Sequence, residues 1–270
     1  MTRARAVESG DYLPEVAESA AQGTVADIYD DIRTVLGLPV VNLVYRCLAV
    51  EPGRLQGIWR SLRRNLTSRA VDSAAEKLVA AARPPGMLPA AGLETAGLGA
   101  NDLVLARATL DAYARGNSRN LLAMHALLDG CRGSGVDAEP AVPATAASIL
   151  PMARLDDLAP EALDRLRSIS AALVGDEKPV LVPSLLRHLA ARPLLLDLLW
   201  RAVEPELVPA LASKRDAVTD EARRLASTLP FAVSRLDRQA ERGIAQRFAA
   251  AMSTLLVTGE TFRATLGERG

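Results

Sequence analysis

Residues 46–60 read RCLAVEPGRLQGIWR and residues 187–201 read RHLAARPLLLDLLWR, so one segment of the chain is written twice. The copies lie 141 residues apart, and the only two tryptophans of the chain, Trp59 and Trp200, occupy equivalent positions in them. This spacing exceeds the roughly 20 to 50 residues of a solenoid unit. The duplication therefore predicts two related halves rather than an array of small repeats.

The duplication extends upstream, where residues 13–32 align with residues 150–169 at an offset of 137. The change of offset predicts a four-residue insertion near residues 175–177. We expect two tandem helical repeats that form a pseudo-dimer, with a ligand pocket in the seam between them. The predicted organisation is an N-terminal extension over 1–12, a first repeat over 13–130, a linker over 131–148 and a second repeat over 149–270.

Apolar residues recur at helical spacing along almost the whole chain. The stripe from Val25 to Ile32 predicts a helix over 24–36, with Thr24 and Asp27 as an approximate capping box. Further helices are expected over 41–50, 53–66, 74–83, 102–114 and 117–129. No long segment shows the alternation of a strand. The predicted fold class is all-α.

A turn is expected at residues 115–118, which read Arg-Gly-Asn-Ser. Asn117 or Ser118 is a suitable cap for the helix that follows. The free amide groups at the start of such a helix would also suit a carboxylate ligand.

Charge and composition exclude several partners. Lys plus Arg and Asp plus Glu number 32 each, so no net charge attracts nucleic acid or an anionic membrane. Aromatic residues make up only 3% of the chain, which argues against base stacking. The first ten residues lack the apolar core of a signal peptide, and no apolar run is long enough to cross a membrane. We expect a globular cytoplasmic protein without nucleic-acid or membrane partners.

Metal and cofactor motifs are not found in the sequence. Cys47 and Cys131 are the only cysteines and are expected to be free thiols, with Cys47 buried in an apolar helix. Two cysteines and two histidines at unrelated spacings give no zinc pattern. A P-loop, a dinucleotide-binding glycine motif and a nucleophile elbow are also missing. The prediction is that the protein uses no metal and no cofactor.

The two histidines, His125 and His188, both lie on apolar helices. Titration near neutral pH makes either one usable as an acid or base, and the alternative is a histidine that only forms a structural hydrogen bond. His188 aligns with Cys47 in the duplication, so it is unique within the repeated motif.

Two arginines, Arg46 and Arg187, recur at equivalent positions in the two copies. Recurrence in both copies favours an architectural role over substrate binding. An ion pair with an acid such as Asp30 or Asp31 would provide that role.

Several motifs together resemble the group I α-haloacid dehalogenases. They are Ile28–Arg33, Leu38–Val41, Arg46–Ala49, Gly116–Asn117, and Leu189–Ala190 with Pro193, so the resemblance spans nearly the whole chain. It implies an all-helical protein of two similar halves that removes halide from both enantiomers of small 2-haloacids such as 2-chloropropanoate. In the implied mechanism an aspartate and an asparagine position a water, which attacks the α-carbon directly without an ester intermediate.

Carried over position by position, the resemblance places the water-positioning asparagine at Asn117 and a pocket serine at Ser184. At the position of the catalytic aspartate this chain has Leu185, which cannot accept a proton. Val40 and Leu43 stand where the family has tryptophan and phenylalanine, which predicts more room for an apolar ligand.

A different base is then required. His188 lies one helical turn beyond Leu185 and is the predicted substitute. An acid from the inserted loop, Asp176 or Glu177, is the alternative. The predicted catalytic residues are His188 and Asn117, and Val40, Leu43, Ser184 and Leu185 are the predicted substrate-binding residues.

The predicted function is that of a diverged haloacid-dehalogenase-like enzyme, of hydrolase type. It would act on a small, mostly apolar organic acid by a route other than the family's aspartate-activated water. Two alternatives stay open, a non-catalytic ligand-binding or interaction protein on the same scaffold, and a working 2-haloacid dehalogenase with a displaced base. Fold alone does not decide among them.

Overall fold

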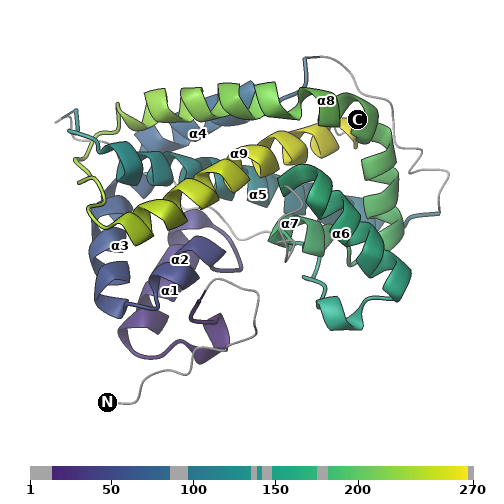
Figure 1. The fold of residues 1–270 in the computed structure, drawn as a ribbon, viewed down its shortest axis with the longest axis horizontal. Coiled ribbons are helices and arrows are strands. Elements are labelled where there is room, and N and C mark those ends of the chain that lie inside the picture. Colours follow the sequence, from purple (N-terminus) through teal and green to yellow (C-terminus); the bar gives the residue numbers. More distant parts are fainter. Residues whose placement is uncertain (1–13, 86–96, 135–138, 142–147, 175–181, 267–270) are drawn as a thin grey trace. The chain divides into compact units, whose positions relative to one another are not determined.

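The fold is all-α, as the sequence predicts, over the part of the chain that the structure describes. A computed structural model describes residues 14–85, 97–134, 139–141, 148–174 and 182–266, and within them no strand is found. The helices are α1 (Thr24–Leu36), α2 (Leu43–Leu48), α3 (Pro52–Leu66), α4 (Arg69–Ala82), α5 (Ala100–Asp129), α6 (Pro160–Val174), α7 (Ser184–Leu189), α8 (Pro193–Ala226) and α9 (Gln239–Thr265), with short 3₁₀ turns at Glu18–Ala20 and Leu155–Asp157 (Figure 1). None of these helices is both long enough and apolar enough to cross a membrane.

The chain forms two compact units, each built from three stretches of sequence. Unit 1 comprises Met1–Lys77, Ser118–Ala146 and Asp220–Ala250, and unit 2 comprises Leu78–Asn117, Ala147–Thr219 and Ala251–Gly270. The boundaries fall inside α4, α5, α8 and α9, so these helices contribute residues to both units. The units differ from the stretches 13–130 and 149–270, whose assignment as tandem repeats stays a prediction.

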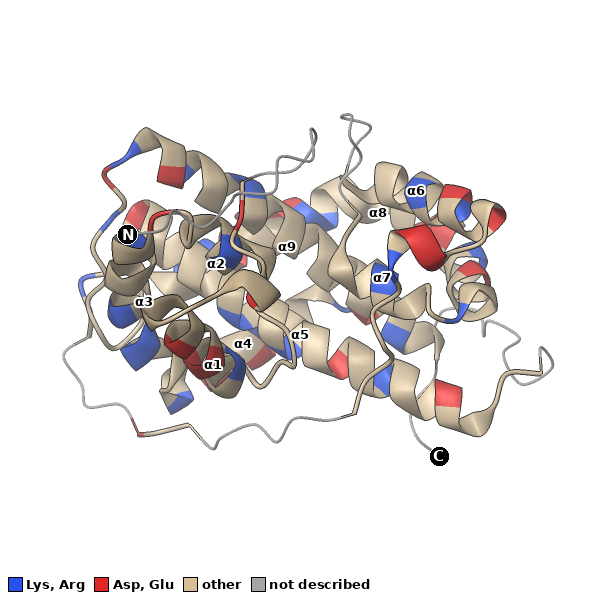
Figure 2. Cartoon of the chain, turned by 90° about the horizontal axis from the view of Figure 1, so that it is seen from below, with Lys and Arg blue, Asp and Glu red and all other residues tan. Residues whose placement is uncertain are grey.

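In unit 1, α1 packs against α3 (Figure 1). Asp31 of α1 connects the two helices, because it accepts a hydrogen bond of 2.7 Å from the Trp59 indole and one of 2.6 Å from Nε of Arg63. Arg63 holds the pKa of Asp31 below its usual range, and Trp59 adds to this effect. Figure 2 shows acidic and basic residues together on the same helices, α1 and α6 among them.

Local geometry recurs at both sequence offsets. The Val16 amide donates to the Arg46 carbonyl at 3.0 Å, and the Ala153 amide donates to the Arg187 carbonyl at 3.1 Å. Helices α2 and α7 both have six residues, and the helix after each of them begins at a proline. These matches support the duplication, and the pseudo-twofold arrangement of the copies stays a prediction.

The predicted turn at residues 115–118 is wrong, because α5 continues through it from Ala100 to Asp129. Asn117 and Ser118 are therefore helix-interior residues, and no helix start at this point offers free amides to a carboxylate. Gly116 costs a helix interior about 1 kcal/mol relative to alanine. Residues 116–128 are all buried, and packing on every side outweighs this local preference.

Two smaller predictions also need correction. Helix α1 begins at Thr24 after Gly23, whose φ is +53°, so Thr24 is the first helical residue and no side chain caps the helix. Arg46 pairs with Glu15 at 3.3 Å rather than with Asp30 or Asp31. In contrast, both cysteines are free thiols and Cys47 is buried, as predicted, and Cys131 is buried as well. The predicted insertion at 175–177, with Asp176 and Glu177, and the N-terminal extension lie outside the described residues.

Gly133 is a position where only glycine fits. Its φ is +76°, and a Cβ there would lie 2.7 Å from the Ala232 backbone nitrogen. We expect Gly133→Ala to lower the free energy of unfolding by about 2 to 4 kcal/mol, through left-handed strain and a backbone clash. Gly57 is an exposed residue of α3, and a Cβ there would meet no atom within 4 Å. Gly57→Ala should instead raise the free energy of unfolding by about 0.5–1 kcal/mol. Urea unfolding of both variants tests this, and equal midpoints would contradict it.

Candidate functional site

His188 is held by a backbone carbonyl in unit 2. It lies on α7, whose buried residues are Leu185, Leu186, His188 and Leu189. The Nδ1 atom of His188 lies 2.6 Å from the carbonyl oxygen of Leu150. A carbonyl oxygen can only accept, so Nδ1 carries the proton and donates it. In the neutral ring Nε2 is then unprotonated and has a free lone pair.

That lone pair is buried and unused. The Nε2 atom of His188 has no hydrogen-bond partner among the described residues, and the residue is 3% exposed. The ring of Tyr113, on α5, packs edge-on against the imidazole with centroids 5.5 Å apart and planes at 60°. A buried nitrogen acceptor without a donor is uncommon in native proteins and calls for an explanation.

The pKa of His188 is lowered from its ordinary value. Burial is the main cause, because it penalises the charged imidazolium, and the positive charge of Arg187 acts in the same direction. The hydrogen bond to Leu150 opposes the shift. His188 is therefore neutral at pH 7 and able to accept a proton at Nε2.

Three other predicted site residues also belong to unit 2. Leu185, which is 1% exposed, faces Gly259 of α9, where a Cβ would lie 3.5 Å from Cδ2 of Leu185. Ser184 is the partly exposed first residue of α7. Asn117 is buried on α5 four residues after Tyr113, so both share the helix face that meets His188.

Val40 and Leu43 belong to unit 1. Val40 lies between α1 and α2, Leu43 is the first residue of α2, and both are partly exposed. The predicted seam pocket that would combine them with His188 and Asn117 stays a prediction.

Sequence patterns did not single out Tyr113 or the backbone of Leu150 as neighbours of His188. Leu150 contributes its backbone, which no side-chain pattern reveals, and Tyr113 is one apolar residue in a long helix. The available signal is the Leu150-Pro151 pair, which follows the linker and aligns with Leu13-Pro14 in the duplication.

The second histidine, His125, lies in unit 1 on α5. Its Nδ1 is 3.6 Å from Oδ2 of Asp129, beyond hydrogen-bond length, and its side chain is 4% exposed. Burial lowers the pKa of His125, and the charge of Arg223 adds to this. Among the described residues of unit 1, no backbone carbonyl is hydrogen-bonded to this ring in the way that Leu150 is hydrogen-bonded to His188.

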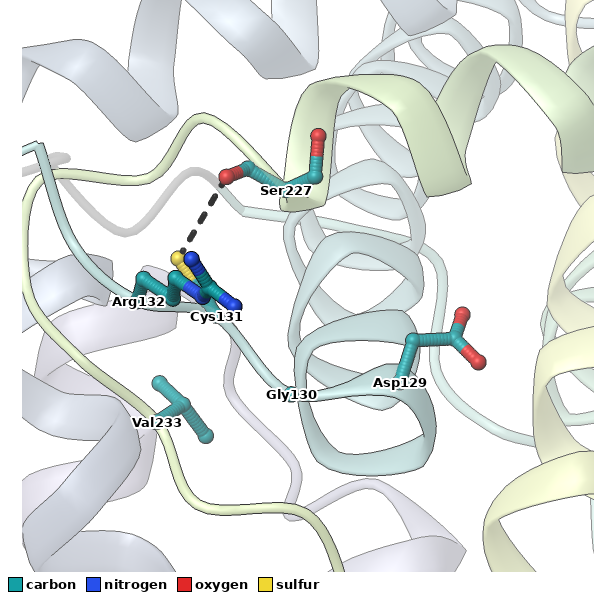
Figure 3. Close-up of a pocket in the computed structure, with 6 residues that line it drawn as sticks. All are labelled: Asp129, Gly130, Cys131, Arg132, Ser227 and Val233. Carbon is teal, nitrogen blue, oxygen red and sulfur yellow. Dashed lines mark hydrogen bonds between the residues drawn. The ribbon is translucent and has the colours of Figure 1, made fainter.

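An open hollow of about 460 Å³ lies in unit 1 beside the end of α5 (Figure 3). It is lined by Asp129, Gly130, Cys131, Arg132, Ser227 and Val233. The Cys131 thiol forms hydrogen bonds with the backbone, since Sγ lies 3.4 Å from the Leu229 carbonyl oxygen and accepts from the Gly133 amide at 3.3 Å. Among the described residues, no three His, Cys, Asp or Glu side chains gather in a geometry that could hold a metal ion.

Comparisons with known proteins link the chain to dehalogenases of 2-haloacids. No family model matches it. It is 27% identical over 124 residues to a configuration-inverting 2-haloacid dehalogenase of Pseudomonas sp. (strain 113), covering 45% of this chain and 40% of that protein. It is 32% identical over 119 residues to a second such enzyme from Alcaligenes xylosoxydans xylosoxydans, covering 43% and 40%. The matches thus span about two-fifths of the length of these curated relatives.

Solved structures show the same fold over nearly the whole chain. A D-2-haloacid dehalogenase in complex with L-LA superposes with a TM-score of 0.76 at 18% identity, covering 95% of both chains. A mutant D-2-haloacid dehalogenase in complex with D-2-CPA gives a TM-score of 0.75 at 18% identity, covering 98% of this chain and 97% of the other.

Proposed function

The chain is a relative of the configuration-inverting 2-haloacid dehalogenases, and on this basis we propose that it is a dehalogenase-like hydrolytic enzyme that acts on a small, mostly apolar organic acid. The observation that carries the proposal is the hydrogen bonding of the two ring nitrogens of His188. Its Nδ1 donates to the Leu150 carbonyl, and its buried Nε2 lone pair has no hydrogen-bond partner in the part of the chain that the structure describes. General-base catalysis by a positioned side chain contributes about 10²- to 10⁴-fold to a rate.

In the proposed reaction Nε2 of His188 removes one proton from a water molecule. The water oxygen forms a bond to the α-carbon of the acid while the carbon–halogen bond breaks, and the halide leaves with the bonding electron pair. Attack opposite the leaving group inverts the configuration. The products are a 2-hydroxy acid, a halide ion and a proton, first held by His188 and then lost to solvent.

The other proposed site residues have binding roles. Asn117 would orient the water, as the resemblance implies, and Ser184 would donate to the substrate carboxylate. Leu185 would provide an apolar contact to the substrate, and Val40 and Leu43 of unit 1 stay proposed substrate-binding residues. Leucine at position 185 removes the carboxylate that the family uses as base, and this is the reason that His188 is needed.

A binding protein without turnover is the second candidate. It is favoured by one observation: Leu185, where the resemblance implies the family's base, is 1% exposed and packs near Gly259. Such a protein would bind small organic acids and release no halide.

Halide release separates these candidates. The native chain and Leu185→Asp would each be given both enantiomers of 2-chloropropanoate and 2-bromopropanoate. Release by the native chain is the expected result. Release by Leu185→Asp alone would mean that the pocket accepts haloacids and that His188 is not an adequate base. Binding without release in either protein would support the second candidate.

The pH dependence of kcat/KM should show the base directly. A base must be unprotonated, so activity falls as the pH drops through its pKa. Because burial lowers the pKa of His188, the acid limb should lie below the ordinary histidine value of about 6.5. Measurement of kcat/KM between about pH 4 and 9 checks this, since a limb above about 6.5 would contradict a buried histidine base.

A further inference from the structure

The backbone of Leu150, which orients His188, is held on both sides of its Cα atom. Its carbonyl accepts the bond from Nδ1 of His188 at 2.6 Å, and its amide donates to Oγ1 of Thr109 at 3.0 Å. Leu150 and Thr109 are fully buried, and His188 is 3% exposed. Three residues far apart in the sequence thus form one continuous hydrogen-bonded chain within unit 2.

Thr109 determines which groups donate and which accept along this series of hydrogen bonds. Its hydroxyl donates to the Leu105 carbonyl one turn earlier on α5, at 2.7 Å. A hydroxyl has one hydrogen to donate, so toward Leu150 the Thr109 oxygen can only accept. It therefore binds the amide of Leu150 and fixes the Ile149–Leu150 peptide plane, which is joined to the Leu150 carbonyl through the φ and ψ angles of Leu150.

Pro151 limits the orientation of the Leu150 carbonyl. A residue before proline is confined to extended backbone conformations, which restricts the rotation that turns its carbonyl. With the amide of Leu150 bound to Thr109, the carbonyl is left facing Nδ1 of His188.

We propose that Thr109 is a positioning residue, which acts through the backbone of Leu150 to keep the proton of His188 on Nδ1 and the lone pair on Nε2. The inference rests on the proposed function, in which that lone pair is the base. Thr109 would then help to orient a histidine base that has no neighbouring carboxylate to orient it.

The test compares three threonine variants. Thr109→Val keeps the shape and removes the hydroxyl, and Thr109→Ser keeps the hydroxyl. Thr258→Val is the matched control, because Thr258 is equally buried in unit 2 and donates to the carbonyl four residues earlier at 2.9 Å. The readout is the nitrogen NMR spectrum of the imidazole rings. The chain has only two histidines, so His125→Gln assigns the signals.

Thr109→Val should change His188 from the Nδ1-protonated tautomer to a mixture of the two tautomers. Thr109→Ser and Thr258→Val should leave the tautomer unchanged. Turnover of 2-chloropropanoate by Thr109→Val should fall roughly tenfold, which corresponds to about 1.4 kcal/mol. Its acid limb should move to lower pH, because the Leu150 bond raises the pKa of His188 and is weakened.

The outcomes distinguish this inference from the proposed function. An unchanged tautomer in folded Thr109→Val overturns the inference, whatever the activity. A changed tautomer in a chain that releases no halide overturns the proposed function and leaves the positioning by Thr109 intact. An equal change in Thr258→Val would show a general loss of packing and would also overturn the inference.

Discussion

Replacement of His188 by glutamine is expected to reduce halide release by about 10²- to 10⁴-fold, the range for loss of a general base. Glutamine fills a similar volume and its amide can still donate to the Leu150 carbonyl, but it has no basic nitrogen. The fold should therefore persist while turnover is lost. The measurement is kcat with 2-chloropropanoate, together with the melting temperature of the variant.

The matched control is His125→Gln. His125 is 3% exposed, as is His188, and within the described ranges neither of its ring nitrogens has a hydrogen-bond partner. Loss of this histidine should leave kcat near that of the native chain. Comparable turnover by His188→Gln and the native chain would exclude His188 as the base, and equal losses in both variants would point to packing instead.

The second large effect is expected on stability, from the buried guanidinium of Arg119. Its side chain is 5% exposed, pairs with Asp72 of α4 and donates to the Val35 carbonyl at the end of α1 at 2.9 Å. Asp72→Ala should lower the free energy of unfolding by about 3–5 kcal/mol, because it leaves a buried charge without its partner. Urea unfolding monitored by circular dichroism gives the value.

A double variant separates the charge from the packing. Arg119→Met in the Asp72→Ala background removes the unpaired charge and keeps most of the apolar stem, so it should recover a large part of the lost stability. A single Asp72→Ala change that costs less than about 1 kcal/mol would show that water reaches the guanidinium.

The helical class and most helix positions could be predicted because they depend on local periodicity. The stripe from Val25 to Ile32 predicted α1, and the helices expected over 41–50 and 53–66 correspond to α2 and α3. The break at Gly116 was wrong, because burial of the whole stretch 116–128 keeps α5 helical against local preference.

The candidate site could be predicted only in part. His188 was singled out because it is unique within a repeated motif, and the structure places it in a setting that suits a base. Its partners could not be predicted, since Tyr113 and Leu150 reach it through tertiary packing across 75 and 38 residues of sequence. The partner of Arg46 was missed for a similar reason, because Glu15 precedes the first helix and belongs to no periodic pattern.

The most direct test of the central claim is a single-turnover reaction of the native chain in oxygen-18 water, with each enantiomer of 2-chloropropanoate. In the proposed reaction, water activated by His188 attacks the α-carbon itself, so the first turnover is expected to release chloride and to place the label in a 2-hydroxypropanoate of inverted configuration. No chloride release from either enantiomer, or a first-turnover product without the label, would contradict it.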